Sequence, residues 1–216
     1  MIRTQEIKHE FINLKYIDCK SEDGNYEILN ASFVADEQTI FGKLDSNYIK
    51  RELEWYMSKS RYIKDMKGKI PKIWKDIADK NGMINSNYGW CIFSEENYFQ
   101  FQNAIIELIN NKFSCRGSMI YIRPTMHNDA KRNGMNDFMC TYAVQLMIRN
   151  NKLHYFVYMR SNDAILGYKN DRFWHDSVLN TCLDQLEKVY PDLQKGNIYW
   201  NCASIHIYPR HFNLIK

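Results

Sequence analysis

The segment that most constrains the fold lies at residues 153–159 and reads LHYFVYM, with apolar side chains on both of its faces. Successive side chains of a strand point to opposite sides of a sheet, so such a strand has to be covered on both faces. Its predicted neighbours are mixed in type, with strands at 118–123, 138–148 and 197–208 and helices at 47–60, 97–111 and 171–190. Because helices and strands do not alternate strictly, we expect an α+β fold.

Composition narrows the class of protein. The chain has 216 residues, of which 45% are hydrophobic, and shows neither a repeat nor a linker, so a single domain over 1–216 is predicted. The net charge is only +4, which argues against direct nucleic acid binding. A membrane span, a signal-peptide core, CxxC and HExxH are not found in the sequence. We therefore expect a cytoplasmic protein with no metal site, disulfide framework or membrane association.

Cys140 is the residue on which a functional interpretation depends. In a strand over 138–148, alternation places one set of side chains on a shared apolar face: Phe138, Cys140, Tyr142, Val144, Leu146 and Ile148. A thiol in such a place is either inert filler or a nucleophile whose thiolate form is set by its neighbours.

Glu52 also breaks its local pattern. The helix predicted over 47–60 has an apolar stripe of Ile49, Leu53, Tyr56 and Met57, and Glu52 falls on the same side. The side chain is either a boundary glutamate that reaches solvent or a partly buried carboxyl with a raised pKa, suited to proton transfer.

Three further features are ambiguous in the same way. Arg160 and Ser161 end the apolar strand, and the arginine needs either an internal carboxylate or a bound phosphate. Asp171 opens the helix predicted over 171–190, where an N-cap or first-turn acid is the usual explanation. His206 and Tyr208 share a strand face and are either core residues or donors to a ligand. Together with Cys140 and Glu52, these features indicate a pocket.

Several stretches, in order and spacing, then suggest a family. They are residues 31–37 (ASFVADE), 51–56 (RELEWY), 71–74 (PKIW), 84–90 (INSNYGW), 137–141 (DFMCT), 159–163 (MRSND) and 204–208 (SIHIY). From about Ala31 to Leu214 the chain resembles the thymidylate synthase superfamily and, within it, the deoxycytidylate hydroxymethylases of T-even-type phages. The resemblance implies a central mixed β-sheet covered by helices, with two sheets stacked back to back in a homodimer.

The resemblance also implies a catalytic group. Cys140 would be the nucleophile that adds to C6 of a pyrimidine and so turns C5 into a carbon nucleophile. Glu52 would organise water and proton transfers near the base, and Tyr88 would lie near the thiol. Arg160 and Ser161 would hold the 5′-phosphate, with Arg160 also favouring the thiolate.

Other positions would bind the rest of the substrates. His206 and Tyr208 match a pair that binds the sugar hydroxyl, and Asn170 would contact the nucleotide. Trp74, Asp163 and Gly167 would contact the folate co-substrate.

Asp171 would identify the base. Thymidylate synthases carry asparagine here, which pairs with N3–H and O4 of uracil. A carboxylate can instead accept from the amine of cytosine and from a protonated N3, so aspartate favours cytosine.

The implied reaction transfers a one-carbon unit from 5,10-methylenetetrahydrofolate to C5 of dCMP, after which water completes 5-hydroxymethyl-dCMP. Alternatives are a superfamily enzyme that acts on CMP or dUMP and a nucleotide-binding homologue without activity. A phage-encoded protein of the host cytoplasm is expected, with other enzymes of nucleotide synthesis as candidate partners.

Two departures from the family are visible. Arg116 matches an arginine donated to the neighbouring subunit's phosphate, but Cys115 stands where the family has a second arginine, which Lys20 or Lys112 would have to replace. The family also continues further beyond His211, whereas this sequence stops at Lys216. We expect a shorter lid to admit water, which suits hydroxymethylation better than hydride transfer.

Overall fold

The computed structural model describes residues 1–13 and 24–215 of the chain. Its α-helices are α1 (Thr4–Ile12), α2 (Ser46–Ser58), α3 (Lys72–Ile77), α4 (Tyr88–Phe93), α5 (Gln100–Asn110), α6 (Met126–Asp129) and α7 (Gly167–Leu186). Its strands are β1 (Tyr26–Val34), β2 (Gly117–Ile120), β3 (Thr141–Arg149), β4 (Lys152–Met159), β5 (Asn162–Asp163) and β6 (Gln194–Ile207). Short 3-10 helices are η1 (Ile63–Asp65), η2 (Glu95–Asn97), η3 (Arg132–Gly134) and η4 (Pro209–Leu214). The α+β prediction is confirmed.

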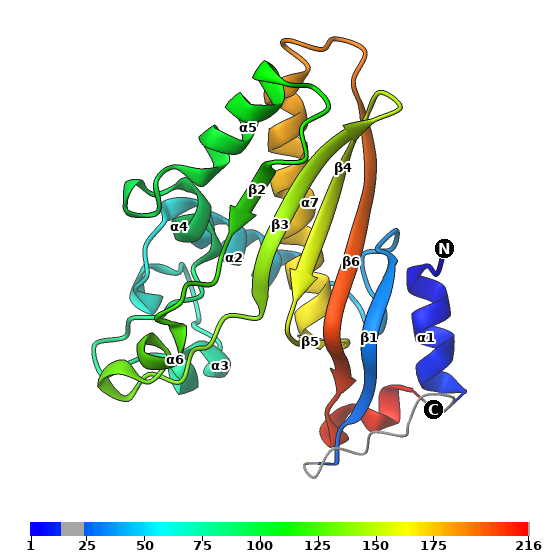
Figure 1. Ribbon diagram of the computed structural model, residues 1–216. Coiled ribbons are helices and arrows are strands. Elements are labelled where there is room, and N and C mark those ends of the chain that lie inside the picture. Colours follow the sequence, from blue (N-terminus) through cyan, green and yellow to red (C-terminus); the bar gives the residue numbers. More distant parts are fainter. Residues whose placement is uncertain (14–23, 216) are drawn as a thin grey trace.

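A mixed sheet with the strand order β1-β6-β4-β3-β2 forms the centre of the molecule (Figure 1). The pairs β1–β6, β2–β3 and β3–β4 are antiparallel, whereas β4 and β6 are parallel. A parallel neighbour cannot be reached through a tight turn, so the chain crosses over through β5 and α7. The short strand β5 pairs with the end of β6, which sets Asp163 beside His206.

A tight hairpin fixes the register at the middle of the sheet. Asn150 and Asn151 connect β3 to β4 with φ angles of 49° and 56°. Two successive left-handed residues match the twist of the flanking strands, and asparagine tolerates this conformation. The hairpin pairs Leu146 with Tyr155, and both side chains are fully buried.

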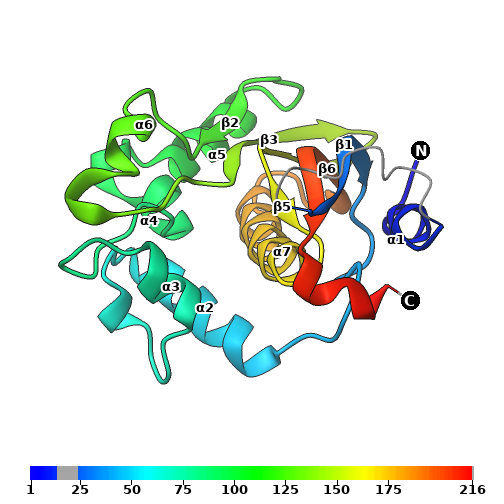
Figure 2. The ribbon, with the colours of Figure 1, turned by 90° about the horizontal axis from the view of Figure 1, so that it is seen from below.

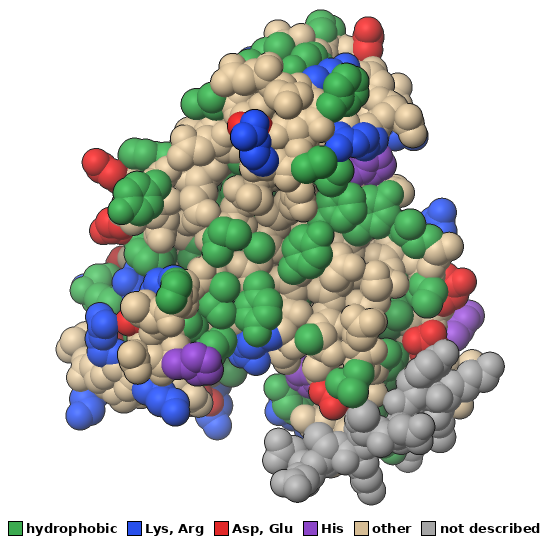
Figure 3. All heavy atoms as spheres, viewed as in Figure 1, with side chains coloured by type: hydrophobic (Ala, Val, Ile, Leu, Met, Phe, Trp, Pro, Cys, Tyr) green, Lys and Arg blue, Asp and Glu red, His purple; other side chains and the backbone are tan. Residues whose placement is uncertain are grey.

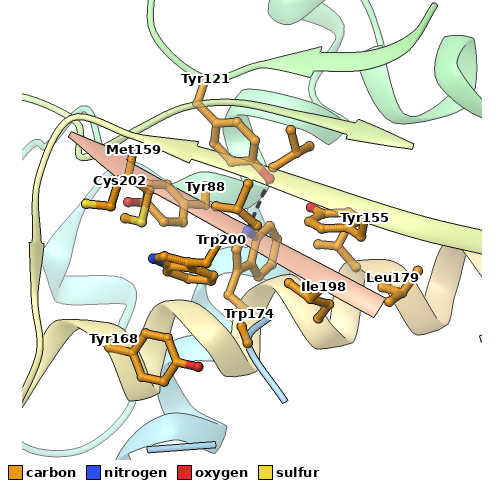
Figure 4. Packing of buried hydrophobic residues seen from close by; sticks show 14 of the residues in the cluster. Tyr88, Tyr121, Tyr155, Met159, Tyr168, Trp174, Leu179, Ile198, Trp200 and Cys202 are labelled. Atoms are coloured by element: carbon orange, nitrogen blue, oxygen red, sulfur yellow. Dashed lines mark hydrogen bonds between the residues drawn. The ribbon is translucent and has the colours of Figure 1, made fainter. Parts of the chain in front are cut away.

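Helix α7 covers one face of the sheet (Figure 2). Its Trp174 and Leu179 are buried together with Tyr155 of β4 and Trp200 of β6 (Figure 4). The Trp174 indole N–H donates to the Tyr121 hydroxyl at 3.2 Å, so this aromatic layer also satisfies a buried polar group.

In the described part of the chain, the opposite face of the sheet is only partly covered, and we call it the open sheet face. Tyr158 is 39% exposed and Phe156 is half-buried, so the prediction that β4 is covered on both faces is wrong for the described single chain. Hydrophobic side chains gather over the middle of this face (Figure 3). Leu29, Ile120 and Tyr142 add further exposed apolar surface. Contiguous exposed apolar surface is more common at interaction sites than on the rest of a protein's surface.

Two predicted helices differ in detail. The segment 47–60 forms α2, but Met57, expected in its apolar stripe, is 50% exposed. The segment predicted as 171–190 forms α7, which begins at Gly167 and ends at Leu186. Tyr168 is fully buried in the first turn, and its hydroxyl donates to the Glu37 carbonyl at 2.9 Å. Tertiary packing therefore extends the helix toward its N-terminus.

None of the helices within 1–13 and 24–215 combines the length and apolar character needed to cross a membrane.

A glycine lets two helices of the site touch. A Cβ atom at Gly89 of α4 would lie 1.8 Å from the Tyr56 carbonyl oxygen of α2, far inside van der Waals contact. The absence of a side chain therefore sets the distance between α2, which carries Glu52, and α4, which carries Tyr88.

We predict that Gly89→Ala lowers the free energy of unfolding by about 3 kcal/mol or more, because backbone has to move to make room. Gly42→Ala is the control, since Gly42 has a φ of +75° but a Cβ there would meet nothing within 4 Å. The control should lose only about 1–2 kcal/mol from backbone strain. Urea unfolding measures both, and equal losses would contradict the close-contact account.

Candidate active site

A cavity of about 540 Å³ opens between α2, α3, α4, the segment before β3 and the start of α7. Most of the side chains singled out in the sequence line it, namely Glu52, Trp74, Tyr88, Cys140, Arg160, Asp163, Gly167, Asn170, Asp171 and Tyr208. They come from elements far apart in the sequence, so the fold brings the predicted group together.

A β-bulge controls where Cys140 points. The β3–β4 register shifts between Thr141 and Ala143, and Cys140 lies just before the strand. Thr141 is fully buried while Tyr142 is 39% exposed, so Tyr142 does not share the buried face with Cys140 and that prediction is wrong. The extra residue breaks the alternation and directs the thiol to the cavity.

Arg160 lies beside the Cys140 thiol. Its Nη2 is 3.7 Å from Sγ, and it donates to the Phe138 carbonyl at 2.7 Å. Its Nε donates to the Met139 carbonyl at 3.0 Å. These bonds hold the guanidinium against the loop that carries the thiol, at the cavity wall.

Burial dominates the electrostatics of Cys140. It raises the pKa of the thiol to about 11, and Asp171 and Asp137 act in the same direction, while Arg160 acts against them. The thiol of the free protein is therefore protonated at neutral pH, and Arg160 is the group that favours its ionisation.

Glu52 stands at the end of a hydrogen-bonded chain. The Trp74 indole N–H donates to the Tyr48 hydroxyl at 3.0 Å, and that hydroxyl donates to Glu52 Oε1. Glu52 is only 5% exposed, so the interpretation as a solvent-reaching boundary residue is wrong. Burial raises the pKa of Glu52 to about 7, against the lowering effect of the Tyr48 hydrogen bond. A carboxyl with this pKa can both give and take a proton at neutral pH.

Asp171 is not a helix cap. It lies beyond the first turn of α7, whose N-cap residue is Leu166. Its Oδ2 accepts a hydrogen bond of 2.7 Å from Asn162 Nδ2. Burial raises the pKa of Asp171 to about 8, Glu52 raises it further, and the Asn162 hydrogen bond lowers it. At neutral pH this carboxyl is mostly protonated.

Tyr88 is buried beside the thiol loop. Its hydroxyl accepts a hydrogen bond of 3.2 Å from the Thr141 hydroxyl, and its ring stacks on Tyr56 at 5.4 Å between centroids. Burial raises the pKa of Tyr88 well above its usual value, with Asp171 and Cys140 contributing, so the phenol stays neutral.

The residues before α7 form a compact turn. Asp163 Oδ1 accepts from the backbone N–H groups of Ile165 at 2.8 Å and Leu166 at 3.2 Å. A Cβ at Gly167 would lie 3.2 Å from Asn162 Nδ2 and 3.3 Å from Asp163 Cβ, so this position favours glycine. The turn fixes the Asp163 carboxylate at the rim of the cavity.

His206 and Tyr208 behave differently from each other. Their rings meet edge to face at 4.8 Å, and His206 is 7% exposed. Tyr208 lines the cavity, whereas His206 and Ser161 do not. His206 thus supports Tyr208 from behind.

The basic residues expected at the phosphate, Arg116 and Lys112, do not line the cavity of their own chain. The Arg116 side chain is 80% exposed and pairs with Glu107 at 3.1 Å. Lys112 donates to Asn151 Oδ1 at 3.1 Å, and Cys115 accepts from Arg149 at 3.2 Å. Lys20 lies outside the described residues.

Sequence reasoning missed several residues of the site. Tyr48 precedes Glu52 by one helical turn, a spacing that could have revealed the pair. Asp137 accepts from the backbone N–H groups of Asn85 at 2.6 Å and Ser86 at 2.7 Å, and it stands next to the thiol loop. Other lining residues that were not predicted are Tyr56, Ile73, Ile77, Asn136, Leu166 and Arg210. Nothing in local periodicity distinguishes these from ordinary surface or core positions.

Comparisons with known proteins place these observations in context. The thymidylate synthase family profile matches residues 40–216. The deoxycytidylate 5-hydroxymethyltransferase of Enterobacteria phage T6 is 51% identical over 191 residues, covering 88% of this chain and 78% of the relative. The enzyme of the same name from Enterobacteria phage T4 is 50% identical over 191 residues, covering 88% of this chain and 78% of that relative.

Solved structures show the same fold. Thymidylate synthase A from Bacillus subtilis superposes with a TM-score of 0.73 at 22% identity, covering 97% of this chain and 80% of that one. Thymidylate synthase from T4 phage gives a TM-score of 0.74 at 18% identity, covering 99% and 78%.

We predict that Asp171→Asn makes stability less dependent on pH. In the wild type the folded-state pKa of Asp171 lies near 8, above the ordinary value of 3.8, so its stabilising contribution is complete below pH 4 and is lost as pH rises toward 8. Each pKa unit corresponds to about 1.4 kcal/mol, so the variant should gain several kcal/mol relative to wild type between pH 4 and pH 8.

Urea unfolding at a series of pH values measures this difference. Asp184→Asn, an exposed change on the same helix, is the control and should follow the wild type. A constant difference between Asp171→Asn and wild type across the range would show that Asp171 ionises normally.

Proposed function

Because the chain belongs to the thymidylate synthase family, we propose that it transfers a one-carbon unit from 5,10-methylenetetrahydrofolate to C5 of dCMP and forms 5-hydroxymethyl-dCMP. The observation that carries the choice of base is the half-buried Asp171 carboxyl, which lines the same cavity as Cys140 and Glu52. The phage relatives named deoxycytidylate 5-hydroxymethyltransferase support the same substrate.

The protonated Asp171 carboxyl suits cytosine. Cytosine presents an acceptor at N3 and a donor amine at C4, and a neutral carboxyl offers one donor and one acceptor. Uracil presents the reverse order at these two positions. A buried polar group left unpaired with the wrong base costs about 1–3 kcal/mol.

Cys140 would act as the nucleophile. The thiol loses its proton, Sγ bonds to C6, and the electron pair of the C5–C6 double bond makes C5 nucleophilic. Arg160, 3.7 Å from Sγ, favours the thiolate and also presents its guanidinium to the cavity, where it would bind the 5′-phosphate with Ser161 alongside. Tyr208 would contact the sugar, supported by His206, and Asn170 would contact the nucleotide from α7.

Glu52 would carry the proton transfers. Folate supplies the one-carbon unit, which bonds to C5; loss of the C5 proton then expels tetrahydrofolate and leaves an exocyclic methylene group. Water then adds to the exocyclic methylene carbon, and departure of Cys140 from C6 restores the ring. A carboxyl with a pKa of about 7, held by Tyr48, can accept and return protons during these steps.

The cavity wall near α3 fits a flat, largely apolar co-substrate. Trp74 lines it together with Ile73 and Leu166, which are 57% and 44% exposed. Exposed apolar groups around a cavity of about 540 Å³ favour a ring system, and Asp163 offers a carboxylate beside it. Gly167 keeps this side of the cavity free of a side chain.

We also propose a homodimer formed through the open sheet face. Exposed Tyr142 and Tyr158 and half-buried Phe156 provide an apolar surface that a second copy would cover. Arg116 is exposed and lies outside its own chain's cavity, and it would exchange its surface ion pair with Glu107 for the phosphate in the partner's site.

We predict that the protein releases tritium from C5-tritiated dCMP in the presence of 5,10-methylenetetrahydrofolate, with 5-hydroxymethyl-dCMP as the product by mass. Cys140→Ser should lower turnover by several orders of magnitude, because the hydroxyl is a far weaker nucleophile. Cys115→Ser, a change at an exposed thiol, should retain turnover.

The same assay with CMP and dUMP defines the substrate. Release from none of the three nucleotides would refute the proposed enzyme. Release from dUMP alone would overturn the role given to Asp171, and unimpaired Cys140→Ser would overturn the nucleophile.

A further inference from the structure

Asn162 stands directly behind the base-recognising carboxyl. It is 2% exposed and does not line the cavity, yet its Nδ2 donates to Asp171 Oδ2 at 2.7 Å. The other end of the amide, Oδ1, is buried without a hydrogen-bond partner. A buried carbonyl left unpaired destabilises a protein, whereas an apolar side chain at the same place would not. The favourable contribution of this amide must therefore come from the hydrogen bond that its N–H group donates to Asp171.

The local fold fixes the direction of this amide. Asn162 belongs to β5 and pairs with Ile205 of β6, so its backbone is held in a sheet. On the other side, a Cβ at Gly167 would lie only 3.2 Å from Asn162 Nδ2. The amide thus occupies a narrow space between β6 and the start of α7, with its N–H group facing Asp171.

The donor has a consequence for the proton of Asp171. A neutral carboxyl has one oxygen that carries the proton and one that only accepts. The Asn162 N–H group can donate to Oδ2 when this oxygen carries no proton. If Oδ2 carried the proton, the N–H group would face the hydroxyl hydrogen, which is also a donor. The hydrogen bond from Asn162 therefore keeps Oδ2 free of the proton and places the proton on Oδ1.

The position of that proton distinguishes the two bases. Cytosine needs a donor opposite N3 and an acceptor opposite its 4-amine, and uracil needs the opposite arrangement. We propose that Asn162 is a positioning residue that selects cytosine over uracil by holding the Asp171 proton on Oδ1, with Oδ1 opposite N3 and Oδ2 opposite position 4. Binding uracil would require the proton on Oδ2, where it would confront the Asn162 N–H group. This inference rests on the proposed function.

Several ionisable groups surround Asp171 and act on its charge. Glu52 and Asp163 oppose ionisation, and Asn162 is the hydrogen-bond donor that favours it. Asp171 also interacts with Tyr48 and Tyr56 of α2, Tyr88 of α4, Cys140 and Cys202 of β6. None of these neighbours is altered by a change at Asn162. Removing the amide should therefore raise the pKa of Asp171 further.

The test compares nucleotide binding by wild type and Asn162→Leu, which has a similar volume but no donor. Dissociation constants for dCMP and dUMP are measured without folate across pH 6–10. We expect the preference for dCMP over dUMP to fall by about tenfold or more in the variant, as expected for loss of one oriented hydrogen-bond pairing. The alkaline loss of dCMP affinity should also move to higher pH.

A matched control lies on the same helix as Asp171. Asn180 Nδ2 donates to Asp176 Oδ2 at 3.1 Å on the exposed side of α7, so Asn180→Leu removes an amide–carboxyl bond away from the cavity. It should leave both the base preference and the pH profile unchanged. If Asn162→Leu does not fold, Asn162→Ala removes the same donor without filling the space.

The outcomes separate this inference from the proposed function. Equal losses of dCMP and dUMP affinity in the Asn162 variant, with an unmoved pH profile, would leave Asn162 a purely structural role and overturn the inference alone. Wild-type protein that binds neither nucleotide, or prefers dUMP, would overturn the proposed function together with it.

Discussion

The desolvation of two carboxyl groups in a single cavity, one buried and one half-buried, is the constraint on which the rest of the site depends. Glu52 projects from α2 and Asp171 from α7, and burial is the largest cause of the raised pKa of each. Each would be an ordinary ionised surface acid without this burial. Hydrogen bonds from their neighbours oppose this rise in pKa in part, since Tyr48 donates to Glu52 and Asn162 donates to Asp171. The outcome is two acids that titrate near neutral pH, which suits the roles proposed for them, proton transfer for Glu52 and base recognition for Asp171.

The sheet and its covering helix position these acids against the thiol. The parallel crossover from β4 to β6 passes through β5 and α7, which places Asp171 next to the end of β4, where Arg160 follows. The Arg160 guanidinium binds the carbonyls of Phe138 and Met139, so the arginine and the Cys140 loop form one rigid unit. The bulge at the start of β3 turns the thiol to the cavity, which the two carboxyls also line.

Apolar periodicity predicts the strands, the helix that carries Glu52 and the side of that helix that is buried. It does so because packing against a core repeats every two residues in a strand and every 3.6 in a helix. The position of Asp171 inside a helix did not follow, since the turn-like residues 167–170 are drawn into α7 by the burial of Tyr168. The bulge at Thr141 could not be predicted from the sequence either, because an extra residue in one strand is defined only by its pairing with the partner strand. The hydrogen bond of Asn162 could not be predicted for the same reason, because its acceptor is a carboxyl on another element. The family resemblance, in contrast, located half of the cavity-lining residues, because it rests on sequence motifs that name those residues directly.

The central claim is that cytosine binds to an Asp171 carboxyl that holds a proton. Calorimetric titration with dCMP in buffers of different ionisation enthalpy measures the protons exchanged on binding. Above the Asp171 pKa of about 8, binding has to restore the proton, so at pH 9 the wild type should take up about one proton per dCMP, and Asp171→Asn should lack this uptake. Tight dCMP binding at pH 9 without proton uptake, or with equal uptake in both proteins, would contradict the account.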